Sequence, residues 1–252
     1  MNQFSRRHFL KSSGIAASYI AISTAITGCT TDTPHTQLSN VEFEHGVASG
    51  DPSSSAVIIW TRVQPAVKIN TAQLAWELAS DREFTQILRT GMVTTQRHQD
   101  FTVKVDVQQL KPATAYYYRF IGANNTSQTG RTLTLPDNNV EQIKLVVVSC
   151  SNYPAGYFNA YHHAAELENI DAVLHLGDYI YEYPMGGYAT EKAAEIGRAL
   201  ATDNDKEIIS LDDYRKRYAI YRTDKGLQAL HAAAPFIAVW DDHEVCNDTY
   251  KN

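Results

Sequence analysis

Short alternating patterns of hydrophobic and polar residues fill the first half of the chain, from about residue 41 to residue 136. The segment 56–62 is a compact run rich in β-branched residues, and the segments 72–78 and 101–107 alternate with a period of two. One face of 101–107 carries Phe101, Val103, Val105 and Val107. A period of two over short segments, separated by turn residues, predicts half-buried β-strands.

The segment 110–120 adds a second signal, because Leu110, Pro112, Thr114 and Tyr116 occupy alternate positions. This pattern resembles the start of a late strand in fibronectin type III and related sandwiches, where the tyrosine hydroxyl fastens a corner to the backbone. We therefore expect residues 41–138 to form an immunoglobulin/fibronectin-like β-sandwich. We find no catalytic constellation in it and expect its aromatic residues to be core or sheet surface.

From residue 141 the pattern changes to continuous apolar runs separated by segments of helical character. The strand-length runs are 143–148, 172–176 and 235–240, and the helical segments are 156–169, 211–221 and 225–233. Continuous apolar runs suit strands buried on both faces, as in α/β sheets. The sequence therefore predicts an α/β domain over residues 141–252, so the whole chain has a mixed fold class.

Polar residues follow each of these three strands. Cys150 follows the first, Asp178 and Tyr181 follow the second, and Asp241, Asp242 and His243 follow the third. Ligands of open α/β sheets bind at the carboxyl ends of the strands. We therefore expect these side chains to share one edge of the sheet.

These residue types suit metal ions and phosphoryl chemistry. A tyrosine ligand needs a strong Lewis acid because its free pKa is about 10, which favours Fe(III) over Zn(II) or Mg(II). A cysteine thiolate also suits iron, whereas carboxylates suit Ca(II) or Mn(II). Such a site would activate a bound water, and His243 could protonate the leaving oxygen or stabilise the equatorial charge.

Each of these residues also has an ordinary structural interpretation. Cys150 could be a small buried residue, Tyr181 a core aromatic and Asp178 a turn residue. Asp241 could be a ligand or could cap the strand end. We interpret Glu182 as support for Tyr181 or for a helix N-terminus.

The first residues have the pattern of an export signal. Arg6 and Arg7 precede an aromatic residue, Leu and Lys, and a mildly apolar stretch then leads to Ile26-Thr27-Gly28-Cys29. This order predicts a twin-arginine lipoprotein signal peptide over 1–28, with lipid attached to Cys29 and a linker over 29–40. The alternative is ordinary cleavage nearby that leaves Cys29 free. We expect export to the periplasm or cell surface, anchored to the membrane by lipid.

Composition and net charge limit the classes of function that the chain can have. The 252 residues are 44% hydrophobic and 20% charged, as in ordinary globular proteins, and the net charge of −6 argues against nonspecific nucleic-acid binding. We also expect no sequence-specific binding of nucleic acid. Three cysteines cannot all pair within the chain, and metal and lipid would account for Cys150 and Cys29.

Longer motifs give a family resemblance. The motifs are Gly46-Val47-Ala48-Ser49-Gly50-Asp51-Pro52, Trp60-Thr61-Arg62, Tyr116-Tyr117-Tyr118-Arg119-Phe120, Ser149-Cys150, His175-Leu176-Gly177-Asp178-Tyr179-Ile180-Tyr181-Glu182 and Trp240-Asp241-Asp242-His243-Glu244-Val245. From about Phe43 onward the sequence resembles the alkaline phosphatase D family of metallophosphoesterases.

This resemblance implies hydrolysis of phosphate mono- and diesters, in small molecules or polymers, with Fe(III) and Ca(II). It implies Cys150, Asp178 and Tyr181 as iron ligands, with Asp178 as a bridge, and it places Asp242 at a metal-ligand position and His243 at the catalytic histidine. It also implies ligands from later strands, so we expect the metallophosphoesterase domain over 141–252 to be incomplete at its C-terminus. The rival hypotheses are a noncatalytic exported lipoprotein whose sandwich binds a partner, and a haloperoxidase or nuclease on a related scaffold.

Overall fold

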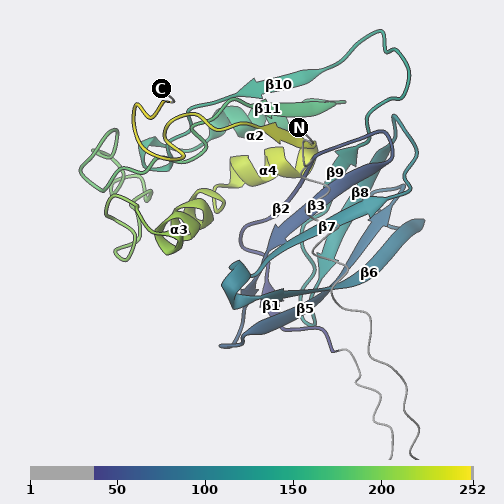
Figure 1. The fold of residues 1–252 in the computed structure, drawn as a ribbon, viewed down its shortest axis with the longest axis horizontal. Helices are drawn as coiled ribbons and strands as arrows, with labels where there is room; N and C mark the ends of the chain where they lie inside the picture. Colours follow the sequence, from purple (N-terminus) through teal and green to yellow (C-terminus); the bar gives the residue numbers. More distant parts are fainter. Residues whose placement is uncertain (1–36, 251–252) are drawn as a thin grey trace, which may run out of the picture. The chain divides into compact units, whose positions relative to one another are not determined.

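The computed structural model describes residues 37–250, and β-strands account for most of their regular structure (Figure 1). A small sheet pairs β1 (Val41–Glu42) with β4 (Gln64–Pro65). A four-stranded antiparallel sheet has the order β6 (Ile87–Gln96), β5 (Thr71–Ala79), β8 (Ala115–Ile121) and β9 (Gly130–Leu133). A six-stranded sheet has the order β10 (Leu145–Val148), β11 (Ala172–His175), β12 (Phe236–Ala238), β2 (Val47–Gly50), β3 (Ala56–Arg62) and β7 (Thr102–Gln108).

The four-stranded sheet and the β2–β3–β7 part of the six-stranded sheet share one hydrophobic core. Ile59 of β3 and Val103 of β7 are buried in it together with Leu74 of β5 and Phe120 of β8. Alternation along the strands produces this core, because every second side chain of a strand points to the same face. The expected sandwich-like arrangement of the first half is therefore present, and β3 has the predicted bounds.

The expected tyrosine corner is confirmed. The backbone N–H of Lys111 donates a hydrogen bond to the Tyr116 hydroxyl oxygen at 2.8 Å. The carbonyl of Lys111 accepts a second hydrogen bond from the Thr134 hydroxyl at 2.6 Å. The turn that enters β8 is thus fixed by two side chains.

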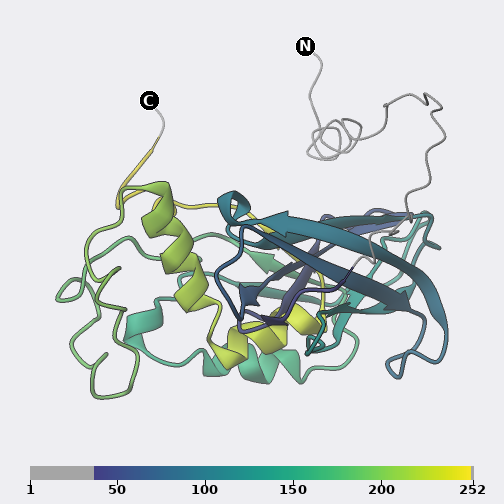
Figure 2. The same ribbon diagram turned by 90° about the horizontal axis from the view of Figure 1, so that it is seen from below.

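The three strands of the second half are parallel to one another. β12 also pairs with β2 in parallel, with Phe236 opposite Gly50, so the sheet continues into the sandwich. The helix α2 (Asn159–Ala165) and the helix α4 (Lys225–Ala233) pack against each other, as Figures 1 and 2 show. Their apolar residues form a second core with β11 and β12.

Side-chain caps determine where the two longer helices begin. The helix α3 (Leu211–Tyr221) starts after Ser210, which exchanges hydrogen bonds with Asp213 in a capping box. The helix α4 starts after Asp224, whose Oδ1 accepts a hydrogen bond from the N–H of Leu227 at 2.9 Å. Among residues 37–250, no helix combines the length and the apolar character needed to cross a membrane.

The expectation that the second-half strands are buried on both faces is wrong for the strands β10 and β12. Leu145 and Val147 of β10 are 45% and 57% exposed, and Ile237 of β12 is 44% exposed. The second core lies on the other face of these strands, where Val146, Val173 and Phe236 pack. Within the described residues, these strands therefore have one covered face and one open apolar face.

Candidate metal centre

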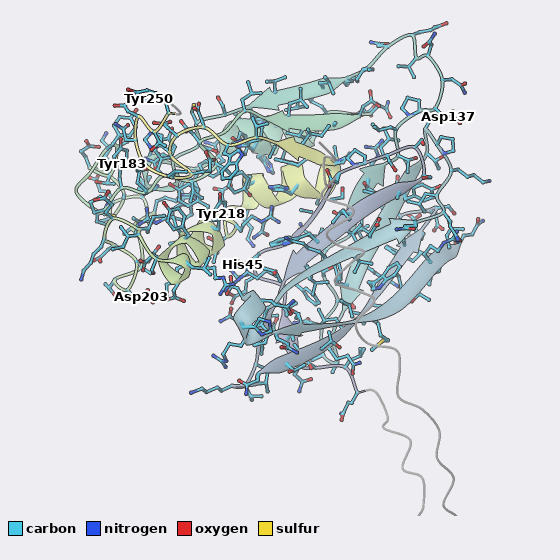
Figure 3. All side chains as sticks on the ribbon, viewed as in Figure 1. His45, Asp137, Tyr183, Asp203, Tyr218 and Tyr250 are labelled. Atoms are coloured by element: carbon cyan, nitrogen blue, oxygen red, sulfur yellow. The ribbon has the colours of Figure 1, made fainter. Side chains whose placement is uncertain are left out.

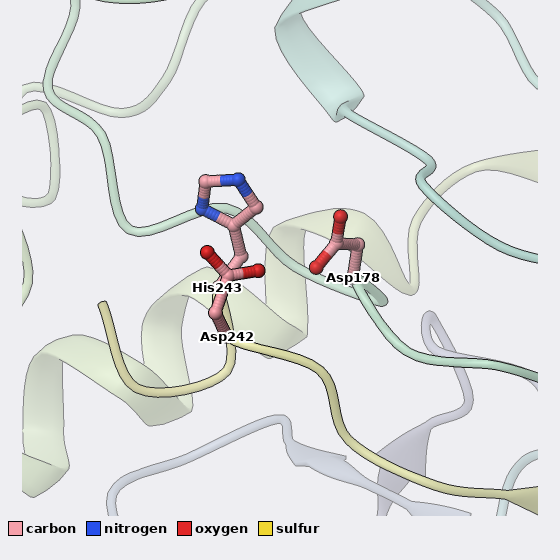
Figure 4. Close-up of side chains that lie close together, drawn as sticks. All are labelled: Asp178, Asp242 and His243. Carbon is pink, nitrogen blue, oxygen red and sulfur yellow. The ribbon is translucent and has the colours of Figure 1, made fainter. Parts of the chain in front are cut away.

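The parallel strands bring their following loops to one edge of the sheet. We call residues 176–183, after β11, the first site loop, and residues 239–248, after β12, the second site loop. Asp178 extends from the first loop, and Asp242 and His243 extend from the second, as Figure 4 shows. Parallel pairing of β11 with β12 is what places these two loops side by side.

Asp178, Asp242 and His243 form the group of side chains with metal-binding geometry in residues 37–250. Each offers one ligand atom, and these atoms lie within 4.8 Å of one another. Asp178 is 7% exposed, and its Oδ1 is buried without a hydrogen-bond partner among the described residues. A buried carboxylate oxygen without a donor is costly, and a bound cation would satisfy it. The donors present therefore fit a metal ion.

Tyr181 lies beside Asp178, and the Cys150 side chain interacts with Tyr181. The Tyr181 hydroxyl donates a hydrogen bond to Asp178 Oδ2 at 3.2 Å. Burial, the charge of Asp178 and the Cys150 side chain all raise the pKa of Tyr181. The phenol is therefore neutral without a cation, and a nearby cation would favour its ionised form. Tyr181 therefore interacts with both other residues that the resemblance names as iron ligands, whereas Cys150 lies outside the group of Asp178, Asp242 and His243.

Cys150 is exposed, so the interpretation of it as a small buried residue is wrong. Its backbone has a positive φ of 55°, and its N–H donates to the carbonyl of Gly177 at 3.2 Å. This bond ties the end of β10 to the first site loop. The thiol is thus held at the same edge as Asp178.

The backbone around Asp178 explains the need for a preceding glycine. Gly177 has a φ of 107°, and a Cβ there would collide with the backbone nitrogen of Asp241. Asp178 itself has a positive φ of 54°, a conformation that turns its side chain out of the strand direction. Asp241 is exposed and lies outside the group of three, so its role as a ligand stays a prediction.

His243 is held by Glu182, a contact that the sequence interpretation missed. His243 Nδ1 lies 2.8 Å from Glu182 Oε2, and the Glu182 side chain is only 3% exposed. The His243 ring also packs against Tyr181, with 4.2 Å between ring centroids. The interpretation of Glu182 as support for Tyr181 or for a helix N-terminus is therefore corrected: Glu182 supports His243.

Glu244 is a second carboxylate that sequence reasoning did not assign. Its Oε2 accepts hydrogen bonds from the N–H groups of Asp178 at 3.1 Å and Asp241 at 2.8 Å. Its Oε1 accepts one from the N–H of Tyr179 at 2.5 Å. The only sequence signal for it is its position directly after His243.

Asp242 has its own backbone support. Its Oδ2 accepts a hydrogen bond from the N–H of Asp248, and this bond, with the nearby His243, lowers the pKa of Asp242. An ionised carboxylate beside Asp178 increases the negative charge of the edge. Such a concentration of charge suits a cation.

Family models match both halves of the chain. The model described as PhoD-like phosphatase matches residues 145–252, and the one described as PhoD-like phosphatase, N-terminal domain, matches residues 28–136. The chain belongs to the PhoD-like phosphatase family. It is 39% identical over 261 residues to alkaline phosphatase D of Bacillus subtilis (strain 168), and it spans 44% of that protein's length.

A solved structure of PhoD is also similar to this chain and supports the same family. It matches this chain with a TM-score of 0.74 and 42% identity, over 82% of this chain and 40% of the PhoD chain. Cys150, Asp178, Tyr181, Asp241, Asp242 and His243 all lie within the range of the PhoD-like phosphatase model. The sandwich core lies within the range of the N-terminal domain model.

Two predicted features of this PhoD-like phosphatase chain lie outside the described residues. These are the signal peptide over 1–28 and lipid attachment at Cys29, both before residue 37. Cys246, the remaining cysteine, is exposed, and its Sγ lies 2.9 Å from the Thr249 hydroxyl. It therefore stays without an assigned role.

Proposed function

We propose that this chain carries a metal centre of a phosphatase that hydrolyses phosphate mono- and diesters. One observation carries the proposal: three potential ligand atoms converge at the strand ends, and one oxygen of Asp178 is buried without a donor. Membership of the PhoD-like phosphatase family supports phosphoesters as the substrate class. The substrates would be small molecules or polymers, recognised through the phosphoryl group.

The donor set suggests which residues would hold which metal. Cys150, Asp178 and Tyr181 would hold Fe(III), because a thiolate and a phenolate suit iron. Asp178 and Asp242, with Asp241 as a further candidate, would hold Ca(II), because calcium prefers oxygen ligands. When bound, these ions supply a water of lowered pKa and neutralise charge on the phosphoryl group.

His243 has a defined proton position in this arrangement. A carboxylate only accepts hydrogen bonds, so the contact with Glu182 Oε2 places a proton on His243 Nδ1. Nε2 is then the nitrogen left to act. In the protonated ring it would donate to the leaving oxygen of the ester or to an equatorial phosphoryl oxygen.

We also propose that the protein is exported by the twin-arginine route and anchored by lipid at Cys29, in the periplasm or at the cell surface. The order of Arg6 and Arg7, the apolar stretch and Cys29 supports this proposal. Expression with radiolabelled palmitate tests it. The label should enter the wild-type chain, and equal labelling of the Cys29→Ser variant would contradict lipid attachment there.

Hydrolysis of a chromogenic phosphodiester tests the function. The purified chain is assayed at alkaline pH with iron and Ca(II), beside Asp178→Asn and the matched control Asp137→Asn, which changes an exposed aspartate. We expect hydrolysis by the wild type and by Asp137→Asn, and its loss in Asp178→Asn. No hydrolysis by the wild type would contradict the proposal and favour a noncatalytic role. Equal hydrolysis by Asp178→Asn would contradict the proposal that a metal centre at Asp178 carries the activity.

A further inference from the structure

Each of the two site loops supplies a glutamate that binds the other loop. Glu182 belongs to the first site loop but binds two groups of the second, whereas Glu244 belongs to the second loop but binds two amides of the first. The two residues lie 62 positions apart in the sequence. Each loop is therefore held by a carboxylate that the other loop supplies.

Glu244 acts on the backbone that carries Asp178. Both of its carboxylate oxygens are used, since Oε1 accepts from the N–H of Tyr179 and Oε2 accepts from the N–H of Asp178. The same Oε2 also accepts from the N–H of Asp241, in its own loop. Glu244 thus joins the first site loop to the second, at the point where Asp178 adopts its positive φ.

Glu182 acts on the side chain and the backbone of the second site loop. Its Oε2 lies 2.8 Å from His243 Nδ1, and its Oε1 accepts from the N–H of Asn247 at 2.7 Å. These contacts lie on both sides of Glu244 in the sequence. Glu182 is buried, so water competes little for either oxygen.

We propose that Glu182 and Glu244 are positioning residues that set the separation of Asp178 from Asp242 and His243 before any metal binds. The inference rests on the proposed function, because it assigns both glutamates to the same metal centre. Neither belongs to the group of three potential ligands. Their bonds to main-chain amides fix loop geometry, which outer contacts of metal ligands commonly do.

A carboxylate suits this task better than an amide. Glu244 receives three N–H donors, and the Glu244→Gln variant would point its own NH₂ group at one or two of them. At Glu182, a glutamine has one accepting oxygen in place of two, for two donors on the second site loop. Both variants keep the size of the side chain, so the loss is confined to hydrogen bonding.

The experiment uses the whole chain with Glu182→Gln, Glu244→Gln and the matched control Glu195→Gln, which changes an exposed glutamate of the same half. Residue-resolved amide hydrogen exchange is first measured on metal-free protein. In Glu244→Gln we expect the amides of Asp178 and Tyr179 to exchange about ten-fold faster or more, because local opening exposes them. In Glu182→Gln we expect the same at Asn247, while β3 exchanges as in the wild type.

Affinity for Mn(II) is then measured by titration on the same four proteins. We expect either glutamate variant to bind roughly 10- to 100-fold more weakly than Glu195→Gln, as for other losses of contacts to ligand residues. If the glutamates only stabilised the fold as a whole, the variants would instead show faster exchange throughout β3, together with a lower thermal midpoint.

Two results would overturn the inference: unchanged exchange at these loop amides, or equal acceleration in β3. Unchanged Mn(II) affinity beside faster loop exchange would also overturn it. Failure of the proposed function looks different, because the wild type itself would then bind no Mn(II). In that case the exchange rates still decide whether the glutamates hold the loops.

Discussion

The replacement of Arg217 by lysine tests how the first site loop is anchored. Arg217 of α3 is 1% exposed and donates five hydrogen bonds. Two go to the carbonyls of Tyr181 and Tyr183, which lie on either side of Glu182 in the sequence. Tyr183 is labelled in Figure 3. The other three go to the side chain and carbonyl of Asn204 and to the carbonyl of Lys206.

The magnitude follows from the number of acceptors. A lysine ammonium offers three donors, so at least two of the five acceptors lose their partner; three of the five bonds are buried and two are part-buried. Each buried polar group without a partner costs about 1–3 kcal/mol, which gives a loss of roughly 2–6 kcal/mol in the free energy of unfolding. For a chain of this size, that corresponds to a fall in thermal midpoint on the order of 10 °C.

Urea denaturation of the wild type, Arg217→Lys and Arg215→Lys provides the assay. Arg215 lies two positions away on the same helix, but it makes an exposed hydrogen bond to the carbonyl of His98. We expect Arg215→Lys to change stability by no more than about 0.5 kcal/mol. A loss below about 1 kcal/mol in Arg217→Lys, or an equal loss in the control, would refute the reasoning.

Three further predictions concern stability. Burial and neighbouring arginines lower the pKa of His45 from 6.5 to about 4, so the unfolded chain takes up this proton first. The contribution of His45 to the free energy of unfolding is complete above pH 6.5 and decreases by at most about 3 kcal/mol as the pH is lowered toward 4. Urea midpoints that stay constant from pH 6.5 to pH 4 would contradict this prediction. Tyr116→Phe removes the bond from the N–H of Lys111 and should cost about 1–3 kcal/mol, measured by thermal unfolding; an unchanged midpoint would show that the corner does not depend on the hydroxyl. Asp224→Asn leaves Arg198 buried without its ion-pair partner at 2.7 Å and should cost about 3–5 kcal/mol; calorimetry that shows under 1 kcal/mol would argue against this pair.

Hydrophobic periodicity predicted most elements that position the site. The bounds predicted for α3 and α4 agree with the structure, and the three second-half strands were all expected. The strand β6 was not predicted, because Thr, Gly and Gln interrupt its apolar residues and most of its side chains are exposed or half-buried. Its place depends on pairing with β5 rather than on its own pattern.

The candidate ligands could be predicted from their positions after strands, but their supports could not. Glu182 and His243 lie 61 positions apart, and Glu244 and Asp178 lie 66 positions apart. These contacts exist only because parallel pairing of β11 with β12 aligns two loops. The partners of Glu244 are main-chain amides, which have no signal in the sequence.

The central claim is that the strand ends of this chain bind metal through Asp178 and Tyr181. The most direct measurement is the iron content and visible absorption of the purified chain beside Tyr181→Phe and Asp178→Asn. We predict bound iron with a tyrosinate charge-transfer band in the wild type, loss of the band in Tyr181→Phe, and loss of iron in Asp178→Asn. Wild-type protein without iron, or a band that persists in Tyr181→Phe, would contradict the account.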